Sequence, residues 1–140
     1  MTAKKTLLLV DDDQDILEQL SLALGAEGYQ VVTAQGQQEA EEALMRCHPD
    51  LAIVDLMMEQ MDSGFVLCYE IKKLYPDTPV ILLTAVTAAT GLDFHAPSRE
   101  ARSWVRADTL LDKPVRFEQL REEVRRLLES RTPQATGAGV

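Results

Sequence analysis

The chain has 140 residues, of which 46% are hydrophobic, so it has the size of one domain and enough apolar residues for one core. Its 14 basic and 23 acidic residues give a formal net charge of -9, which disfavours direct binding to nucleic acid and to anionic membrane surfaces. No apolar run approaches the roughly 20 residues that cross a bilayer, and the amino terminus leads directly into a strand-length segment instead of a signal sequence. We therefore expect a cytoplasmic protein with a single domain.

Short apolar runs recur along the chain, separated by segments that are long enough for a helix. The runs are TLLLV (6–10), YQVVTA (29–34), LAIV (51–54), PVILLTA (79–85) and DTLLD (108–112). Their apolar residues do not alternate with polar ones, which is typical of strands covered on both faces, as in a parallel sheet. The sequence therefore predicts an α/β fold with a doubly wound parallel sheet of five strands.

Helical periodicity occupies the segments that follow these runs. The predicted helices span 15–25, 37–47, 64–74 and 116–131. Their apolar positions are Ile16, Leu20, Ala23 and Leu24 in the first, Ala40, Ala43, Leu44 and Cys47 in the second, Val66, Leu67, Tyr69, Ile71 and Leu74 in the third, and Phe117, Leu120, Val124, Leu127 and Leu128 in the last. We expect Pro76 to stop the third helix, because proline lacks the backbone N–H group and its ring clashes with the preceding turn.

The carboxyl-terminal residues have a different composition. From Thr132 onwards the residues are mostly small and show no periodicity. Such a segment lacks the apolar surface that would offset the entropy of ordering it. We therefore predict a domain at 1–131, followed by a flexible tail or truncated linker at 132–140.

Carboxylates gather where two of the predicted strands end. Asp11 and Asp12 follow the first run, and Asp55 follows the third. Because right-handed crossovers bring the carboxyl ends of parallel strands to one edge of the sheet, we expect these side chains to lie close together. Two carboxylates about 4 Å apart repel by roughly 4 kcal/mol at an effective dielectric constant of about 20, so the cluster favours a cation. Oxygen ligands at an accessible edge suit Mg²⁺.

Acidic residues at this place in the chain can also cap a helix. An aspartate just before a helix accepts hydrogen bonds from its first amide groups and interacts well with its dipole. We favour this interpretation for Asp13 and Asp15, which lie at the start of the first predicted helix. For Asp11, Asp12 and Asp55 we favour metal binding.

A calcium loop of the EF-hand type is a further alternative, because Asp11, Asp13 and Asp15 occupy alternate positions. Such a loop needs glycine at its sixth position and glutamate at its twelfth. Here these positions hold Ile16 and Leu22. The sequence therefore excludes this type of site.

Segments at the ends of the predicted strands together form a recognisable pattern. LLLVDDD, VDLMMEQMDSG, ILLTA and DKP occur in this order and extend over nearly the whole chain. With them the chain resembles the receiver domains of two-component response regulators. The resemblance implies a flavodoxin-like fold, in which the five parallel strands have the order 2-1-3-4-5.

The resemblance also implies a Mg²⁺ site. Asp11 and Asp12 would form the acidic pair that holds the ion, together with Asp55. Met57 would contribute its backbone carbonyl oxygen, so the nature of its side chain matters little for metal binding.

In the same family pattern, Asp55 is the phosphoacceptor, Thr84 is the hydroxyl residue at the end of the fourth strand, and Lys113 is the lysine that pairs with the phosphoryl group. The chemistry is consistent with these roles. A carboxylate can attack phosphorus and form an energy-rich acyl phosphate. Mg²⁺ and a lysine then offset the negative charge of the transferring group.

Several positions depart from the family pattern. Glu59 replaces the usual proline after the phosphoacceptor, and Ser63 stands where a glycine is usual, with Gly64 one place later. Leu110 replaces the aromatic residue that many receivers use as a rotamer switch. The segment 85–104 is longer than usual, and we expect it to form a modified partner surface.

We therefore expect a receiver that takes a phosphoryl group onto Asp55 from a sensor histidine kinase or a phosphotransfer protein. Phosphorylation would change its affinity for an unidentified output protein, and a homodimer is compatible with this function. The domain would not be an enzyme beyond its own phosphorylation and dephosphorylation. Output would pass through protein contacts, unless an effector domain follows the residues at 132–140.

Two alternative functions have specific signatures. A pseudo-receiver would keep the fold as a phosphorylation-independent binding module, but the joint presence of the acidic residues, Thr84 and Lys113 argues against it. A phosphatase of the haloacid dehalogenase type also begins with an Asp-x-Asp loop after a strand, as residues 11–13 do. Those enzymes need a substrate cap and a longer core, for which this chain is short.

Overall fold

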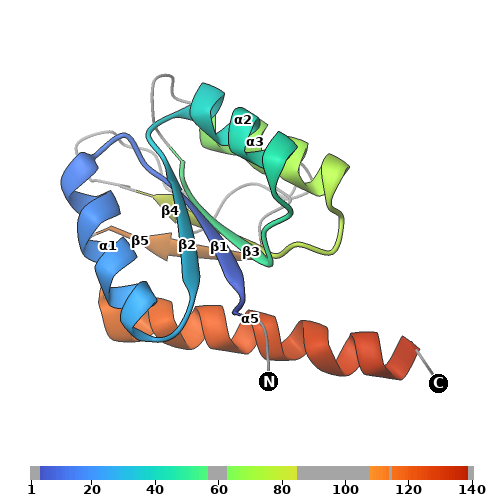
Figure 1. Cartoon of the computed structure of the whole chain (residues 1–140). Helices are drawn as coiled ribbons and strands as arrows, with labels where there is room; N and C mark the ends of the chain where they lie inside the picture. Colours follow the sequence, from blue (N-terminus) through green and yellow to red (C-terminus); the bar gives the residue numbers. More distant parts are fainter. Residues whose placement is uncertain (1–3, 57–62, 85–107, 114, 139–140) are drawn as a thin grey trace.

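Figure 1 shows the computed structural model of the chain, in which a parallel sheet lies between two layers of helices. The structure describes residues 4–56, 63–84, 108–113 and 115–138. In chain order its elements are β1 (Thr6–Val10), α1 (Gln14–Ala26), β2 (Gln30–Ala34), α2 (Gln37–Arg46), β3 (Leu51–Asp55), α3 (Ser63–Leu74), β4 (Val80–Thr84), β5 (Thr109–Asp112) and α5 (Phe117–Ala138). The 5-stranded sheet has the order β2-β1-β3-β4-β5, which confirms the predicted flavodoxin-like fold.

Each face of the sheet packs against its own pair of helices (Figure 1). One face of the central strands packs with α2 and α3, through Leu8, Val10, Ala52, Val54, Val80 and Leu82. The alternate residues pack with α1 and α5, through Leu7, Leu9, Leu51, Ile53, Ile81 and Leu83. Because successive side chains of a strand point to opposite faces, strands covered on both sides are apolar throughout. This double burial holds the ends of β1, β3 and β4 firmly in place.

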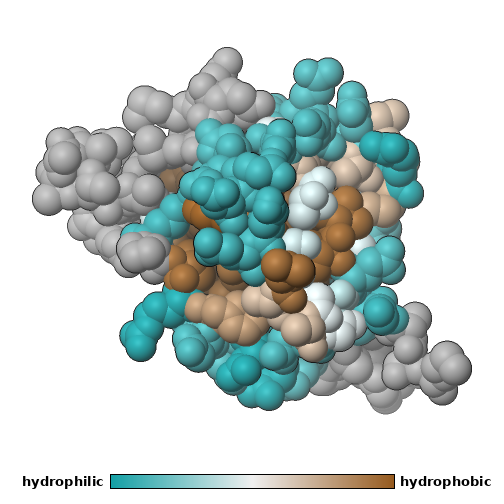
Figure 2. All heavy atoms as spheres, turned by 60° about the vertical axis from the view of Figure 1, so that its left-hand side comes forward, coloured by the Kyte–Doolittle hydropathy of each residue, from teal (hydrophilic) through white to brown (hydrophobic). Residues whose placement is uncertain are grey.

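Some large apolar side chains are exposed. Figure 2 shows apolar atoms at the surface between hydrophilic areas, on the side where Figure 1 has α1. Leu22 of α1 is 77% exposed, and the other exposed large apolar residues of the described chain are Met45, Val66, Tyr69, Leu74 and Leu110. Single exposed apolar residues are normal on soluble domains, so they are not in themselves evidence of a binding surface.

The last helix is longer than the sequence predicted. We expected it to end at Arg131 and a flexible tail or truncated linker to follow, but α5 continues to Ala138 and includes Pro133. Extending a formed helix needs no new nucleus, so the loss of an apolar face does not end it. Figure 1 shows this end of α5 projecting beyond the sheet. The division into a domain at 1–131 and a linker at 132–140 remains a prediction.

Several sequence-based expectations concern residues outside the described part. These are the carbonyl ligand Met57, the substitution at Glu59 and the long segment 85–104. Among the described residues, no helix combines the length and the apolar character needed to cross a membrane.

Candidate functional site

The ends of four strands place the predicted site residues at one edge of the sheet. Asp11 immediately follows β1, Asp55 ends β3, Thr84 ends β4, and Lys113 immediately follows β5. The backbone amide of Lys113 donates a 2.8 Å hydrogen bond to the carbonyl oxygen of Thr84, so these two residues are neighbours across the sheet. The carboxyl ends of the parallel strands thus form the edge at which ligands bind in folds of this type.

A cluster of carboxylates lies at this edge. Asp11, Asp12 and Asp55 each offer one oxygen that lies within 4.8 Å of the other two. Asp11 and Asp55 are buried, whereas Asp12 is exposed. The amide of Asp13 donates to Oδ1 of Asp11 at 2.9 Å, and the amide of Asp11 donates to the carbonyl oxygen of Ala34 at 3.1 Å. Both the backbone and the carboxylate of Asp11 are therefore held in place.

Lys113 contributes the positive charge of the site. Its Nζ lies 3.1 Å from Oδ2 of Asp11 and 3.3 Å from Oδ2 of Asp55. Burial by itself would lower the pKa of Lys113, but the charges of Asp55 and then Asp11 outweigh it, and the pKa is raised above its ordinary value of 10.5. Lys113 therefore stays protonated and neutralises part of the acidic cluster.

The crowding of negative charge affects the pKa of Asp12. Loss of hydration, followed by the nearby charge of Asp11, raises the pKa of Asp12, while Lys113 acts in the opposite direction. A raised pKa means that the ionised form of Asp12 is disfavoured at this position. A bound cation would relieve that cost.

Thr84 lies beside these charges and is buried, with 2% of its surface exposed. Within the described residues its Oγ1 is buried and has no hydrogen-bond partner. Leaving a buried hydroxyl unpaired costs about 1–3 kcal/mol, so packing alone does not favour a threonine over an apolar residue at position 84. The hydroxyl can donate to an oxygen of a bound group.

The three carboxylates fit a Mg²⁺ ion. Ligand oxygens on opposite sides of a Mg²⁺ ion bound at about 2.0–2.1 Å lie about 4 Å apart. One oxygen each of Asp11, Asp12 and Asp55 lies within 4.8 Å of the other two, so the three carboxylates are close enough together to share one ion. All three offer the hard oxygen ligands that Mg²⁺ prefers. Met57, the predicted fourth protein ligand, lies outside the described residues.

The predicted capping role is confirmed for Asp13. Its Oδ1 accepts hydrogen bonds from the amides of Asp15 at 3.0 Å and Ile16 at 3.4 Å, at the amino end of α1. Asp15 itself lies in the first turn of the helix, where a negative charge also suits the dipole. The third aspartate of the run thus begins the helix, while the first two belong to the acidic cluster.

Two features of the site were not predicted from the sequence. Lys113 contacts Asp11 as well as Asp55, although only a pairing with the phosphoryl group was expected. Gly64, buried at the start of α3, donates its amide to the carbonyl oxygen of Leu56, the residue directly after Asp55. The displacement of the glycine from position 63 was the signal that could have drawn attention to this contact.

Comparison with known proteins identifies the family. Residues 7–125 match the model of the response regulator receiver domain. The chain belongs to this family. Transcriptional regulatory protein GlrR of Escherichia coli (strain K12) is 40% identical over 127 residues, which cover 91% of this chain and 27% of GlrR. Response regulator MprA of Mycolicibacterium vanbaalenii is 34% identical over 133 residues, which cover 95% of this chain and 54% of MprA. The chain thus spans about a quarter of GlrR and about half of MprA.

Solved receiver structures have the same fold. The CheY-like receiver domain protein of Methanospirillum hungatei JF-1 superposes with a TM-score of 0.80 at 27% identity, covering 94% of this receiver and 99% of that chain. Response regulator TrrA of Thermotoga maritima, solved in complex with Mg(2+)-BeF, has a TM-score of 0.72 at 34% identity, with coverages of 88% and 98%. The receiver is therefore a module of two-component signalling and not an enzyme of the usual kind.

Proposed function

We propose that this receiver accepts a phosphoryl group on Asp55, with Mg²⁺ present, from the phosphohistidine of a sensor kinase or a phosphotransfer protein. The observation that supports this most directly is the position of the buried Asp55 carboxylate. It lies in a cluster with Asp11 and Asp12 and within 3.3 Å of the Lys113 ammonium. A nucleophilic carboxylate is thus combined with the groups needed to offset the charge of a phosphoryl group.

In the transfer, a carboxylate oxygen of Asp55 attacks phosphorus. A phosphorus–oxygen bond forms while the phosphorus–nitrogen bond of the phosphohistidine breaks, and the electron pair of that bond remains on the imidazole nitrogen. Later attack by water on phosphorus releases inorganic phosphate and restores the carboxylate. Asp55 is therefore both the acceptor and the group that is regenerated.

The surrounding residues act on the charge of the transferring group. Bound Mg²⁺ would withdraw negative charge from the phosphoryl oxygens, and Asp11, Asp12, Asp55 and the carbonyl of Met57 are the proposed ligands. Lys113 pairs with a second phosphoryl oxygen, for which its raised pKa keeps it protonated.

Thr84 is proposed to donate its hydroxyl to a third phosphoryl oxygen. Its buried Oγ1 has no partner among the described residues, which is consistent with a hydroxyl that donates a hydrogen bond only when a phosphoryl group is bound. Because Thr84 and Lys113 occupy adjacent strand ends, occupation of the site acts on β4 and β5 together.

The output is proposed to be a change in affinity for a protein partner. Such a change is a shift of population between two conformations of the receiver. The aromatic switch of many receivers is absent, because its position in β5 holds Leu110, which is 38% exposed. The longer relatives are described as a transcriptional regulatory protein and a response regulator, so gene regulation is a proposal for the whole protein to which this receiver corresponds.

Intact-mass measurement tests the phosphoacceptor role. The protein is incubated with acetyl phosphate, with and without Mg²⁺, as wild type, as Asp55→Asn and as Asp77→Asn. Asp77 is exposed in the turn after α3 and serves as the matched control. We expect Mg²⁺-dependent addition of one phosphoryl group to wild type and Asp77→Asn, and none to Asp55→Asn. Failure to label wild type, where a known receiver is labelled, would favour the pseudo-receiver. Undiminished labelling of Asp55→Asn would place the acceptor elsewhere.

A further inference from the structure

The first turn of α3 lies directly against the backbone that carries the phosphoacceptor. The amide of Gly64 donates a 2.9 Å hydrogen bond to the carbonyl oxygen of Leu56. A Cβ atom on Gly64 would lie 2.4 Å from Cα of Leu56 and 2.6 Å from the carbonyl oxygen of Asp55. Non-bonded carbon atoms normally stay about 3.5–4.0 Å apart, so a methyl group here would push the two backbones apart by about 1 Å.

The requirement for glycine at this position is one of space. Among the described residues the only positive φ angle belongs to Gly28, so Gly64 does not need the left-handed conformation. In the family pattern, moreover, the usual glycine falls on position 63, which here is Ser63. The close contact at Gly64 therefore concerns the start of α3 in this chain, and not the usual glycine position of the family pattern.

The helix side of this contact cannot easily give way. Leu67, Cys68 and Ile71 of α3 are at most 1% exposed and pack in the core against the sheet. Moving α3 outwards would open this packing along the helix, and close-packed interiors resist such shifts. The end of β3 can move more easily than α3, because it lies at the polar site and not in the apolar core. It is still held by one hydrogen bond, which the amide of Leu56 donates to the carbonyl oxygen of Leu83 at 2.8 Å.

We propose that Gly64 is a positioning residue for Asp55. By allowing α3 to begin against the Asp55–Leu56 peptide, it fixes the Asp55 carboxylate relative to Asp11 and Lys113. This inference rests on the proposed phosphoacceptor function of Asp55. A misplacement of about 1 Å at a reacting group can reduce a rate by as much as about 10²-fold, so a small shift is enough to affect transfer.

The test compares Gly64→Ala with two control variants. Gly25→Ala adds the same methyl group to α1, where no neighbouring atom of the described residues lies within 4 Å of the added carbon. Leu67→Ala removes core packing from α3 and lowers stability without adding an atom next to Asp55. For each folded protein, we would measure the rate of phosphoryl uptake from acetyl phosphate, the dissociation constant for Mg²⁺ by calorimetry, and the thermal unfolding midpoint.

We expect Gly64→Ala to slow phosphoryl uptake by roughly 10-fold to 100-fold at saturating Mg²⁺ and acetyl phosphate, and to weaken Mg²⁺ binding. Gly25→Ala should behave as wild type. Leu67→Ala should unfold at a lower temperature but take up phosphoryl groups near the wild-type rate while it is folded. This pattern of results would distinguish a displacement of the Asp55 carboxylate from a general loss of stability.

Three results would overturn the inference: a wild-type rate and Mg²⁺ affinity in Gly64→Ala, an equal loss of rate in Leu67→Ala, or failure of Gly64→Ala to fold, since Gly64 would then determine the fold as a whole. If wild type itself takes up no phosphoryl group, the proposed function fails instead. In that case the Mg²⁺ dissociation constants still decide whether Gly64 positions Asp55 in the acidic cluster.

Discussion

The ammonium group of Lys113 lies 3.1 Å from Oδ2 of Asp11, a carboxylate that is completely buried. Lys113 also contacts Asp55, so one cation serves both buried acids. Asp12 is the third acid of the cluster and is exposed to water. A divalent cation bound at the proposed site would thus have an electrostatic role that overlaps with that of the lysine, and the stability of the domain should depend on both.

Removing Lys113 tests this overlap. In Lys113→Ala we expect the free energy of unfolding without divalent cations to fall by on the order of 1–3 kcal/mol, because buried carboxylates lose their charged partner. Saturating Mg²⁺ should recover most of this loss. Urea denaturation with and without Mg²⁺ measures both quantities, with Lys4→Ala as an exposed control. An equal loss under both conditions would show that Lys113 acts through packing and not through charge.

Thr84→Val tests the unpaired hydroxyl. Because the buried Oγ1 of Thr84 has no partner in the part of the chain that the structure describes, its removal should leave stability unchanged or raise it by up to about 1 kcal/mol. The same change should slow phosphoryl uptake, since the hydroxyl that we propose as a donor to a phosphoryl oxygen is lost. Thermal unfolding and intact-mass kinetics give the two results, with Thr33→Val on β2 as an exposed control. A clearly destabilised Thr84→Val would mean that the hydroxyl has a structural partner.

The strands could be predicted closely because burial on both faces leaves an unbroken apolar run. Every residue of β3 and β4 is buried, and their predicted and observed bounds differ by one residue or fewer where both are described. The helices were harder, because an apolar residue on a helix need not face the core. In α3 the spacing of Leu67 and Ile71 identifies the buried face, whereas Val66, Tyr69 and Leu74 are exposed.

The arrangement of the site could be predicted only in part. The rule that parallel strands end at one edge was enough to expect Asp11, Asp12 and Asp55 together. It does not determine the path of a long side chain, so the contact between Lys113 and Asp11 could not be foreseen. The contact of Gly64 depends on backbone separation, which residue types do not reveal.

A carboxyl pair between α2 and α3 makes stability depend on pH. Burial, and then hydrogen bonding to Glu41, raises the pKa of Glu70 to about 7. The hydrogen bond from Glu70, followed by that from Gln37, lowers the pKa of Glu41. Between pH 4.5, the ordinary pKa of glutamate, and about 7, the folded protein keeps a proton that the unfolded chain has lost. The stabilisation from the proton on Glu70 is therefore lost as the pH rises from 4.5 to about 7, whereas the lowered pKa of Glu41 makes the contribution of the pair decline again as the pH falls below 4.5.

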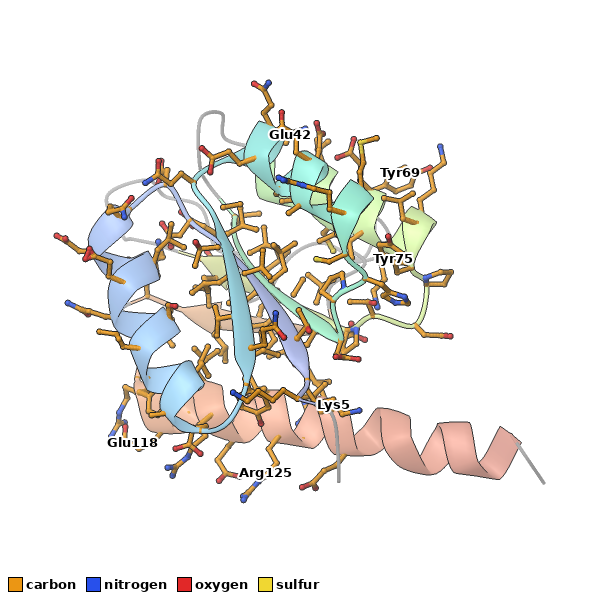
Figure 3. All side chains as sticks on the ribbon, viewed as in Figure 1. Lys5, Glu42, Tyr69, Tyr75, Glu118 and Arg125 are labelled. Carbon is orange, nitrogen blue, oxygen red and sulfur yellow. The ribbon has the colours of Figure 1, made fainter. Side chains whose placement is uncertain are left out.

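Glu70→Gln should remove this pH dependence, because its amide can donate to Glu41 at every pH. We expect the difference in unfolding free energy between Glu70→Gln and wild type to grow in favour of the variant as the pH rises towards 7. Urea denaturation across this interval measures it. Glu42→Gln is the control, since Figure 3 shows Glu42 on the outer side of α2. A difference that stays constant with pH would contradict the shared proton.

Asp108 lies just before the edge strand β5, and its side chain makes two contacts whose contributions to stability can be measured separately. One oxygen of Asp108, Oδ2, accepts from Nζ of Lys72 at 2.9 Å and from the amide of Val80 at 2.8 Å. Asp108→Asn removes the ion pair but keeps an acceptor for Val80, so it should cost no more than about 1 kcal/mol at this partly exposed position. Asp108→Ala also leaves the amide of buried Val80 without this acceptor and should cost roughly 1–3 kcal/mol.

Chemical denaturation of both Asp108 variants, alone and combined with Lys72→Ala, distinguishes the two contacts. Lys72→Ala should add little to Asp108→Asn, because the charge that it pairs with is already gone. If both Asp108 variants lose the same stability, the ion pair, and not the hydrogen bond to Val80, holds the start of β5. Since Thr84 and Lys113 lie at the opposite ends of β4 and β5, Asp108→Ala should also slow phosphoryl uptake more than Asp108→Asn does.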